Sequence, residues 1–543
     1  MKLLDNTSSQ IERGKLTLPN RRQIWKWVEL KREELGDWLV ANRELTLLVS
    51  IIVLAALFRL WQLPSLPYGL HPEEAANGLD AISILQGDIQ PFYESAGGRE
   101  GLLFYLQALS VAIFGPTMFA LRLMPALAGI GAVFMIYLAG RVWFSRRVGL
   151  MAAFFMAISP WAIHMSRLAL PAALLLLLVP TILWLSARAL QTNRAGWFVA
   201  TGVAIGLGFY VQPSWHVLPL ALAPLLLFSR YFYRSQLRQL WQPLLIVLLS
   251  VLVTLLPFAA YMATNSSAYF ERPTTSVFNA EQRDEPLAQV LVESVGRTAG
   301  MFHIAGDRNQ LHNLRGEPQL TALVGVLFLL GLLLSWRRRH DIRYTALVSL
   351  LAVLLLPAAL SMGNVAPSAL RAVAAAPIIY ILAAIGLSEL IARWRGVFPR
   401  NPLALHLAIT IIVAAGAITT IYSYQRYFVA WANAPQTFTA SYEPMRAVAE
   451  FMLTHDIDGT YFVVASEYQV LSVSFLTDGK VEYIQVSPPD AGEVELAVGD
   501  RLIVPYLNRE QDIELGAAAL DQVTQISRYR SDTALFTLYR VEE

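Results

Sequence analysis

Long apolar runs separated by short polar stretches fill most of the first 424 residues. About 20 apolar residues in a helix cross a hydrocarbon core about 30 Å thick, and on this criterion the pattern predicts about eleven spans. The expected spans are 45–60, 120–144, 148–163, 168–190, 197–211, 215–228, 240–262, 320–336, 344–360, 372–391 and 403–422. The pattern therefore predicts a mainly α, polytopic membrane protein.

A further apolar run, 102–114, is short and closes at Gly115-Pro116, which indicates a juxtamembrane helix. If it does not cross, the later arginine clusters share the cytoplasmic side with the basic N-terminal tail, as the positive-inside bias requires. The clusters are Arg141/Arg146/Arg147, Arg188/Arg194, Arg230/Arg234/Arg238, Arg337/Arg338/Arg339 and Arg393/Arg395/Arg400. We therefore expect a plasma (inner) membrane protein with a cytoplasmic N-terminus and an extracytoplasmic C-terminus.

The chain beyond Tyr422 changes character, because the apolar runs become short. Residues 443–455 have the period of an amphipathic helix, and five short runs between turn residues predict strands. The expected strands are 461–465, 480–486, 502–505, 523–529 and 534–541. We expect a cytoplasmic basic tail (1–44), a transmembrane domain (45–424) with outer loops at 64–119 and 263–319, and a small outer α/β domain (425–543).

The composition agrees with a membrane protein and excludes several chemistries. The 543 residues are 55% hydrophobic and 15% charged, against about 25% charged in soluble domains. Cysteine is absent, which excludes disulfides, thiolate metal sites and a cysteine nucleophile. No phosphate-binding G-x-x-x-x-G-K-[ST] motif occurs, which argues against ATP as an energy source. We expect no cofactor and no nucleic-acid partner.

The first outer loop is unusually acidic for a segment between apolar runs. It carries Glu73, Glu74, Asp80, Asp88, Glu94 and Glu100. Adjacent side chains point in different directions, so at most one of Glu73 and Glu74 is expected to react. A solvated Glu-Glu pair is the alternative interpretation. The neighbouring His71, Pro72 and Asp80, beside the membrane surface, favour a functional one.

Two arginines are candidates for holding an anion at the outer surface. Arg167 lies at an outer helix junction, and Arg371 lies at the outer start of a span. A charged residue at membrane depth is a functional hypothesis, with snorkelling to the interface as the alternative. Arg59 would serve equally well as an interfacial anchor.

The second outer loop contains a polar cluster of His303, Asp307, Arg308, His312 and Asn313. Histidine with aspartate would also suit a metal. Gly306 before Asp307 indicates a loop, however, so we expect loop ordering or acceptor contacts and no metal.

The stretch L-H-P-E-E-A-A-N-G-L-D-A-I-S-I-L-Q-G (70–87) resembles the first outer loop of the polyprenyl-phosphate-sugar-dependent glycosyltransferases of the C-type membrane fold. These include the protein O-mannosyltransferases (glycosyltransferase family 39) and the lipid A aminoarabinose transferases, whose loop carries an Asp-Glu pair. Glu73 stands in place of the Asp, and Glu74 matches the Glu. The similarity continues through 121–129, 140–150, 157–171 and 306–318.

The resemblance implies an inverting transfer of a sugar from a polyprenyl-phosphate donor to a hydroxyl acceptor on a protein, lipid or glycan. Glu73 would be the general base and Glu74 a supporting or substrate-binding acid. Arg167 and Arg371 would hold the lipid phosphate through forked hydrogen bonds. Asp80 and Glu100, with the cluster at 303–313, would belong to the substrate loops.

Two departures from the family pattern favour an alternative function. Glu73 is one methylene longer than Asp, and Ala172 stands where many relatives have an acid. The alternative is a non-catalytic lipid-linked-sugar transporter or an envelope-assembly protein. Transporters usually contain repeated sets of spans, and no repeat is evident in this sequence.

Overall fold

The computed structural model describes residues 41–221, 234–265, 267, 269, 277–278, 285–362, 365–508, 520–526 and 534–541. The chain divides into two compact units, Met1–Ile51 and Ile52–Glu543. Most of the expected basic tail, residues 222–228 of one expected span and most of 266–284 lie outside the described residues. The predicted domain boundaries stay predictions.

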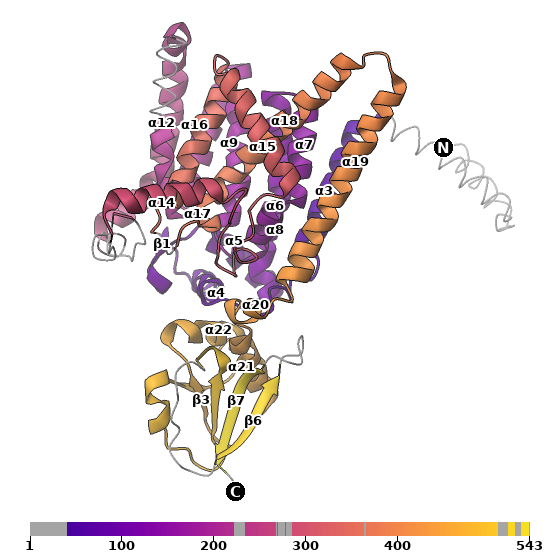
Figure 1. Ribbon diagram of the computed structural model, residues 1–543. Coiled ribbons are helices and arrows are strands. Elements are labelled where there is room, and N and C mark those ends of the chain that lie inside the picture. Colours follow the sequence, from indigo (N-terminus) through magenta and orange to yellow (C-terminus); the bar gives the residue numbers. More distant parts are fainter. Residues whose placement is uncertain are drawn as a thin grey trace, which may run out of the picture. The chain divides into compact units, whose positions relative to one another are not determined.

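The described part of the first 424 residues is almost entirely helical (Figure 1). The long helices are α3 (Arg43–Leu60), α6 (Met118–Trp143), α7 (Arg146–Ile158), α9 (Ala172–Thr192), α10 (Ala195–Gly208), α12 (Arg234–Thr264), α15 (Ala322–Arg337), α16 (Ile342–Ala359), α18 (Ala376–Val397) and α19 (Pro402–Tyr424). Shorter elements are α4 (Pro72–Leu85), β1 (Phe92–Tyr93), η1 (Ser95–Gly97), β2 (Arg99–Glu100), α5 (Leu102–Phe114), α8 (Pro160–Arg167), η2 (Pro213–Ala221), α14 (Leu287–Gly300), α17 (Ala369–Ala372) and η4 (Val373–Ala375).

Among the described residues, six helices are long and apolar enough to cross a membrane, and the bent pair α7–α8 would make a seventh. The predicted count of eleven stays a prediction. The expected span at 148–163 corresponds to this bent pair, in which the chain bends by 61° between α7 and α8. Pro160 lacks an N–H, and the Ser159 side chain accepts from the Ala162 N–H at 3.2 Å to begin a new helix. Residues 213–221, the start of another expected span, form a 3₁₀ helix.

Helices α10 and α12 pack closely along a row of small residues. A Cβ atom at Gly202 would meet Ser250, and one at Gly206 would meet Thr254 at 2.7 Å. Only glycine allows the two backbones to approach so closely.

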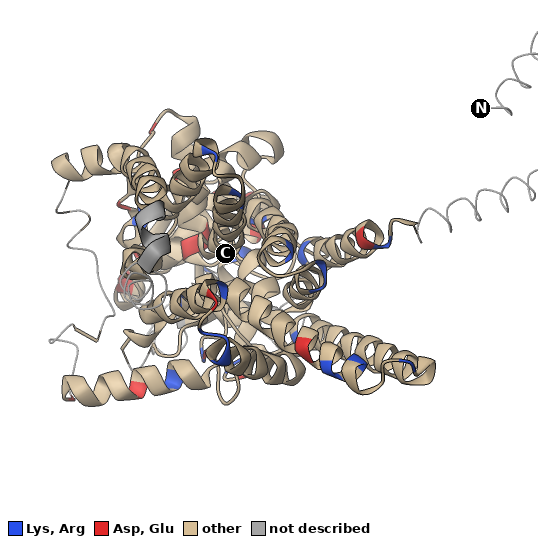
Figure 2. Cartoon of the chain, turned by 90° about the horizontal axis from the view of Figure 1, so that it is seen from above, with Lys and Arg blue, Asp and Glu red and all other residues tan. Residues whose placement is uncertain are grey.

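Charge is sparse along the long helices, which are almost wholly tan in Figure 2. The described arginine clusters lie at the turns α6–α7, α9–α10, α15–α16 and α18–α19. The opposite ends of these helices make the contacts with the two outer loops described below.

The chain after α19 forms the predicted α/β region. It contains a π-helix η5 (Gln425–Trp431), α20 (Pro435–Ala440), α21 (Glu443–Thr454), β3 (Tyr461–Val464), α22 (Glu467–Thr477), β4 (Tyr483–Val486), η6 (Pro488–Glu493), β5 (Arg501–Pro505), η7 (Tyr506–Asn508), β6 (Leu520–Ile526) and β7 (Ala534–Val541). The sheet order is β4-β3-β5-β7-β6. Strand β3 pairs in parallel with β4 and β5, and β7 pairs antiparallel with β5 and β6. Residues 527–529 of one expected strand lie outside the described residues.

Helix α21 packs its apolar face on this sheet, with Met445, Val448 and Met452 buried against Val463 and Ile503. Helix α22 was not predicted. It begins with a capping box, in which the Ser466 hydroxyl accepts from the Gln469 N–H and the Gln469 side chain accepts from the Ser466 N–H.

Helix α22 also packs on α4 of the first outer loop. Phe475 is fully buried in a cluster with Leu70, Ala75 and Leu121. Its ring lies where a Cβ atom on Gly78 would stand, so the two helices are in direct contact. This packing brings the C-terminal region to the acidic loop.

Candidate active site

Helix α4 begins at the acid pair, and its first turn sets the two carboxylates apart. Pro72 is the first residue, where a missing N–H costs nothing. His71 is the N-cap: its Nδ1 accepts from the Glu73 N–H at 3.2 Å, while the His71 N–H donates to Glu74 Oε2 at 3.3 Å. Glu74 is thereby turned toward the protein interior, and Glu73 remains on the outer side of the turn.

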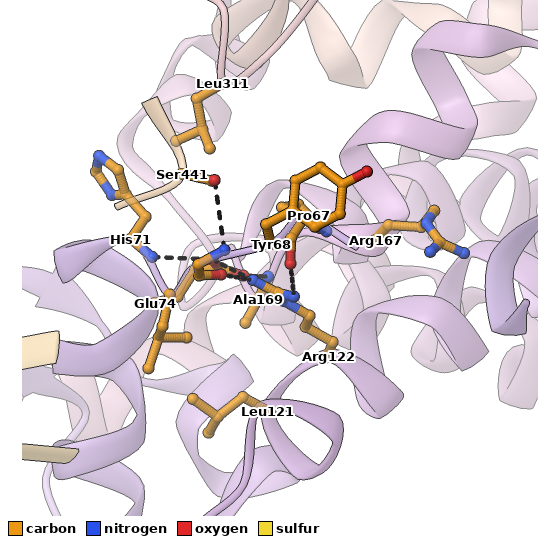
Figure 3. A network of polar contacts seen from close by, with 12 residues as sticks. Pro67, Tyr68, His71, Glu74, Leu121, Arg122, Arg167, Ala169, Leu311 and Ser441 are labelled. Atoms are coloured by element: carbon orange, nitrogen blue, oxygen red, sulfur yellow. Dashed lines mark hydrogen bonds and ion pairs between the residues drawn. The ribbon is translucent and has the colours of Figure 1, made fainter. Parts of the chain in front are cut away.

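Glu74 is fully buried and every one of its oxygens is engaged (Figure 3). The Arg122 guanidinium, also fully buried, donates through Nε to Oε1 and through Nη2 to Oε2, both at 3.1 Å. The Ala169 N–H donates to Oε1 at 2.7 Å. The carboxylate thus joins α4 to α6 and to the segment between α8 and α9.

The segment that leads into α4 is held by side chains from several elements. Arg122 donates to the carbonyls of Pro67 at 2.8 Å and Gly69 at 2.5 Å. Arg446 of α21 donates to the Tyr68 carbonyl, and Ser472 of α22 donates to the Leu70 carbonyl at 2.8 Å. The four successive carbonyls 67–70 are therefore fixed from the helical region on one side and from the C-terminal region on the other.

Glu73 differs from Glu74 in being partly exposed. Among the described residues, its carboxylate takes part in no hydrogen bond or ion pair, although its backbone carbonyl accepts from Arg99 at 3.3 Å. The carboxylate lies close enough to His71, Arg99, Tyr442 and Tyr468 for its charge to affect their titration. Burial raises the pKa of Tyr442 and Tyr468, and the charge of Glu73 raises both further.

Asp80 and Arg99 form a second polar group beside Glu73. Arg99 Nη2 lies 2.6 Å from Asp80 Oδ2, and the Ser95 hydroxyl donates to Asp80 at 2.8 Å. Arg99 Nη1 also donates to the Asn77 side chain, and its guanidinium lies 5.0 Å from the Phe104 ring centroid. Burial raises the pKa of Asp80, although Arg99 opposes this shift, and burial lowers the pKa of Arg99. The predicted substrate-loop acid Asp80 thus anchors the loop.

Glu100 is buried in the short hairpin β1–β2. Its carboxylate lies 4.0 Å from His216 Nε2, a contact that becomes an ion pair when the histidine is protonated. The His216 ring stacks on Phe209, and its Nδ1 lies 2.9 Å from the Tyr269 hydroxyl. These contacts join the first loop to η2.

Arg167, predicted to hold phosphate, is fully buried. Its guanidinium donates to the carbonyls of Phe58, Arg59 and Leu66 at 3.0–3.1 Å and to the Tyr427 hydroxyl at 3.1 Å. In this conformation Arg167 closes the end of α3, as an N–H donor to carbonyls that the helix leaves without partners.

Arg371 keeps part of its side chain exposed, at the start of the α17–α18 segment. Its Nη1 donates to the Ser361 hydroxyl at 2.7 Å. Of the two predicted phosphate ligands, Arg371 is the one with a surface that an anion can reach.

The second outer loop holds its polar cluster by internal contacts and is irregular, as Gly306 predicted. Asp307 accepts from the Asn309 N–H at 2.8 Å and from the Ala369 N–H at 2.7 Å. His312 Nδ1 lies 3.8 Å from Asp307, and Asn313 donates to the Asp307 carbonyl at 3.0 Å. Arg426 of η5 donates to Asn313 Oδ1 at 2.8 Å. These contacts are what a loop-ordering role requires.

The other two members of the predicted cluster lie nearer the solvent. His303 is exposed, and its Nε2 lies 3.1 Å from the Gly325 carbonyl. Arg308 is exposed as well. Among the described residues, no group of three or more histidine, aspartate or glutamate side chains is arranged to hold a metal.

Several residues of this site were not predicted. Arg122 had a signal, since it is a charged residue inside an expected span. Arg99, Tyr442, Tyr468 and Arg446 had none, because only the folded chain brings them to the acid pair.

The fold has known counterparts. It matches ArnT of Cupriavidus metallidurans in the apo state with a TM-score of 0.56 at 13% identity, covering 92% of this chain and 98% of ArnT. It matches the archaeal oligosaccharyltransferase AglB of Archaeoglobus fulgidus, in complex with an inhibitory peptide and a dolichol-phosphate, with a TM-score of 0.53 at 15% identity, covering 93% and 75%. The chain has the C-type fold of the membrane glycosyltransferases. The resemblance seen in the sequence is thereby confirmed at the level of the fold.

Sequence comparison points to the same group. Residues 102–261 match the family model described as dolichyl-phosphate-mannose-protein mannosyltransferase. A stretch of 176 residues is 26% identical to YkcB of Bacillus subtilis (strain 168), which is named as a mannosyltransferase. That stretch is 31% of this chain and spans about a quarter (24%) of YkcB. Within the C-type fold, the chain therefore carries a mannosyltransferase-like segment that follows the acid pair.

Proposed function

We propose that this chain is an inverting membrane glycosyltransferase that moves a sugar from a polyprenyl-phosphate donor to a hydroxyl acceptor. The observation that carries the proposal is the contrast within the acid pair. The Glu74 carboxylate is buried and its oxygens accept hydrogen bonds from Arg122 and Ala169. The Glu73 carboxylate is partly exposed and has no partner in the described part of the chain. The similar structures include ArnT bound to undecaprenyl phosphate, with a TM-score of 0.51.

In this reaction Glu73 takes the proton of the acceptor hydroxyl. The hydroxyl oxygen bonds to the anomeric carbon, and the bond from that carbon to the phosphate oxygen breaks, with its electron pair leaving on the phosphate. A general base contributes typically 10²–10⁴-fold to such a step. Arg371 is assigned to the departing phosphate, because guanidinium N–H groups suit phosphate oxygens and part of its side chain is exposed. Arg167 is assigned a positioning role.

Several hydrogen bonds fix the backbone at Glu73 and just before it. His71 caps the turn, Arg99 binds the Glu73 carbonyl, and the carbonyls 67–70 are fixed by three further side chains. A base whose backbone is fixed loses little entropy when the substrate binds. The proposed outer orientation follows from the arginine-bearing turns at the opposite helix ends.

The experiment that tests the function separates sugar transfer from lipid translocation. The full chain is reconstituted into proteoliposomes with undecaprenyl phosphate carrying a labelled mannose, glucose or 4-aminoarabinose, and an envelope extract from cells lacking the protein supplies acceptors. The proposal expects label in a new glycosidic product, formed at least about a hundredfold more slowly by Glu73→Gln. Movement of the labelled lipid between leaflets without product would show a transporter instead.

A further inference from the structure

Two tyrosine rings from the C-terminal region stand next to the acid pair. Tyr442 is the N-cap of α21, and Tyr468 is the second residue of α22. The His71 ring lies edge-on to both, with centroids 5.0 Å from Tyr442 and 6.2 Å from Tyr468. The charge of Glu73 acts on both phenols, so both rings share its surroundings.

The backbone holds Tyr442 in an uncommon conformation. Its φ of 60° and ψ of 40° lie in the left-handed region, which large side chains rarely occupy. Gly69 packs so closely here that a Cβ atom on it would overlap the backbone from Ser441 to Glu443. A strained residue that the surrounding structure enforces is an observation from which a functional role can be inferred.

The hydroxyls of these two tyrosines are not used within the described part of the chain. Neither hydroxyl takes part in a hydrogen bond there. By contrast, the hydroxyls of Tyr427, Tyr461 and Tyr483 are each hydrogen-bonded. Tyr468 is 38% exposed, and Tyr442 is partly exposed. Their rings and hydroxyls are therefore available to a ligand at Glu73.

A sugar ring has the chemistry that this arrangement fits. Its C–H face packs against the negative face of an aromatic ring, and its hydroxyls bond with phenol oxygens. We infer that Tyr442 and Tyr468 form the subsite for the sugar ring of the donor, supplied by the C-terminal region beside Glu73. This inference rests on the proposed function and assigns the C-terminal region a part in binding the donor.

The test compares the bare lipid phosphate with three forms of it that each carry a different sugar. Binding of undecaprenyl phosphate, bare or carrying mannose, glucose or 4-aminoarabinose, is measured on the full chain in nanodiscs. Wild type is expected to prefer one sugar-bearing lipid over the bare lipid. Tyr468→Ala should reduce that preference about threefold to tenfold, the worth of one aromatic contact, with binding of the bare lipid unchanged.

Two control variants show whether a loss of preference comes from the Tyr468 ring itself. Tyr468→Phe keeps the ring and should retain most of the preference. Glu467→Ala changes the neighbouring exposed residue of the same helix turn and should leave it unchanged. Tyr442→Ala, in the strained position, should reduce the preference as well if its thermal midpoint shows that it folds.

The outcomes separate this inference from the function beneath it. If wild type and Tyr468→Ala show the same preference for the sugar-bearing lipid, the subsite is overturned, while the proposed transferase function is unaffected. A wild type that binds all the lipids alike overturns the subsite too, and sugar transfer in proteoliposomes then decides the function separately.

Discussion

In both outer loops a carboxylate accepts hydrogen bonds from the backbone, but only the first loop has a second carboxylate beside it that accepts none among the described residues. In the first loop, Glu74 accepts from the Ala169 N–H at 2.7 Å, and in the second, Asp307 accepts from the Ala369 N–H at 2.7 Å. Each loop is also bound by an arginine, Arg122 of α6 in the first and Arg426 of η5 in the second. In the first loop, a second carboxylate stands directly beside the anchored one.

The difference separates structural from chemical acids. Both oxygens of Asp307 and of Glu74 accept hydrogen bonds, so these carboxylates order the backbone. The Glu73 carboxylate has none within the described residues and is partly exposed. Burial and pairing therefore distinguish Glu73, the proposed base, from the carboxylates that order the backbone.

The largest expected effect comes from breaking the anchor of the first loop. Arg122→Met leaves Glu74 buried without its cation, and such a loss costs about 3–5 kcal/mol. The free energy of unfolding in detergent should fall by that amount. The matched control is Arg141→Met on the same helix, where the side chain is exposed and the change should be within about 0.5 kcal/mol. Equal effects in the two variants would contradict the anchoring role.

The next largest loss of stability is expected from a change at the contact between the first loop and the C-terminal region. Gly69→Ala places a methyl group against the backbone of Ser441–Glu443, and overpacking of this kind costs about 1–3 kcal/mol. Thermal unfolding should show a lower midpoint. Gly196→Ala, where a Cβ atom meets nothing within 4 Å, is the control and should be neutral or slightly stabilising. A neutral Gly69→Ala would show that this contact does not form.

The anchor of the second loop should be weaker than that of the first. Asp307→Asn replaces one acceptor oxygen by an amide beside backbone N–H groups, which costs about 1–3 kcal/mol. Asp341→Asn, at a partly exposed cap, should cost less than about 1 kcal/mol. Below its unfolding midpoint, Asp307→Asn should keep its sugar-transfer rate. A loss of transfer in a folded Asp307→Asn would give the second loop a chemical role.

The smallest effect concerns the pH dependence of the α4 cap. Burial lowers the pKa of His71 below 6.5, although the charges of Glu73 and Glu74 oppose the shift. The unfolded chain therefore binds this proton more readily, so the stabilising contribution of neutral His71 is present above pH 6.5 and declines as the pH falls below it. His71→Asn keeps a capping side chain without a titrating group and should flatten the dependence of the midpoint between pH 7 and 5. Parallel curves for the two proteins would exclude His71 as the source.

Much of the architecture was predictable because it follows from length and periodicity. The apolar runs and the α/β region were both predicted from local pattern. The bend at Pro160 had a local signal that the length criterion ignored. Helix α22 also had one, the capping box of Ser466 and Gln469.

The site was predictable only in part. The acid pair and the requirement that its members diverge were evident from the sequence. The partners that decide between them come from far along the chain: Arg122 lies 48 residues from Glu74, and Ser472 lies 402 residues from Leu70. Such pairings depend on tertiary packing, which no local pattern encodes. The burial of Arg167 was hidden for the same reason.

The sugar-transfer rate of Glu73→Gln, measured in proteoliposomes at saturating donor, tests the central claim most directly. Glutamine keeps the size of the side chain and removes its basicity, so the rate should fall at least about a hundredfold while the unfolding midpoint stays within a degree or two of wild type. Undiminished transfer by this variant would contradict the assignment of Glu73 as the base.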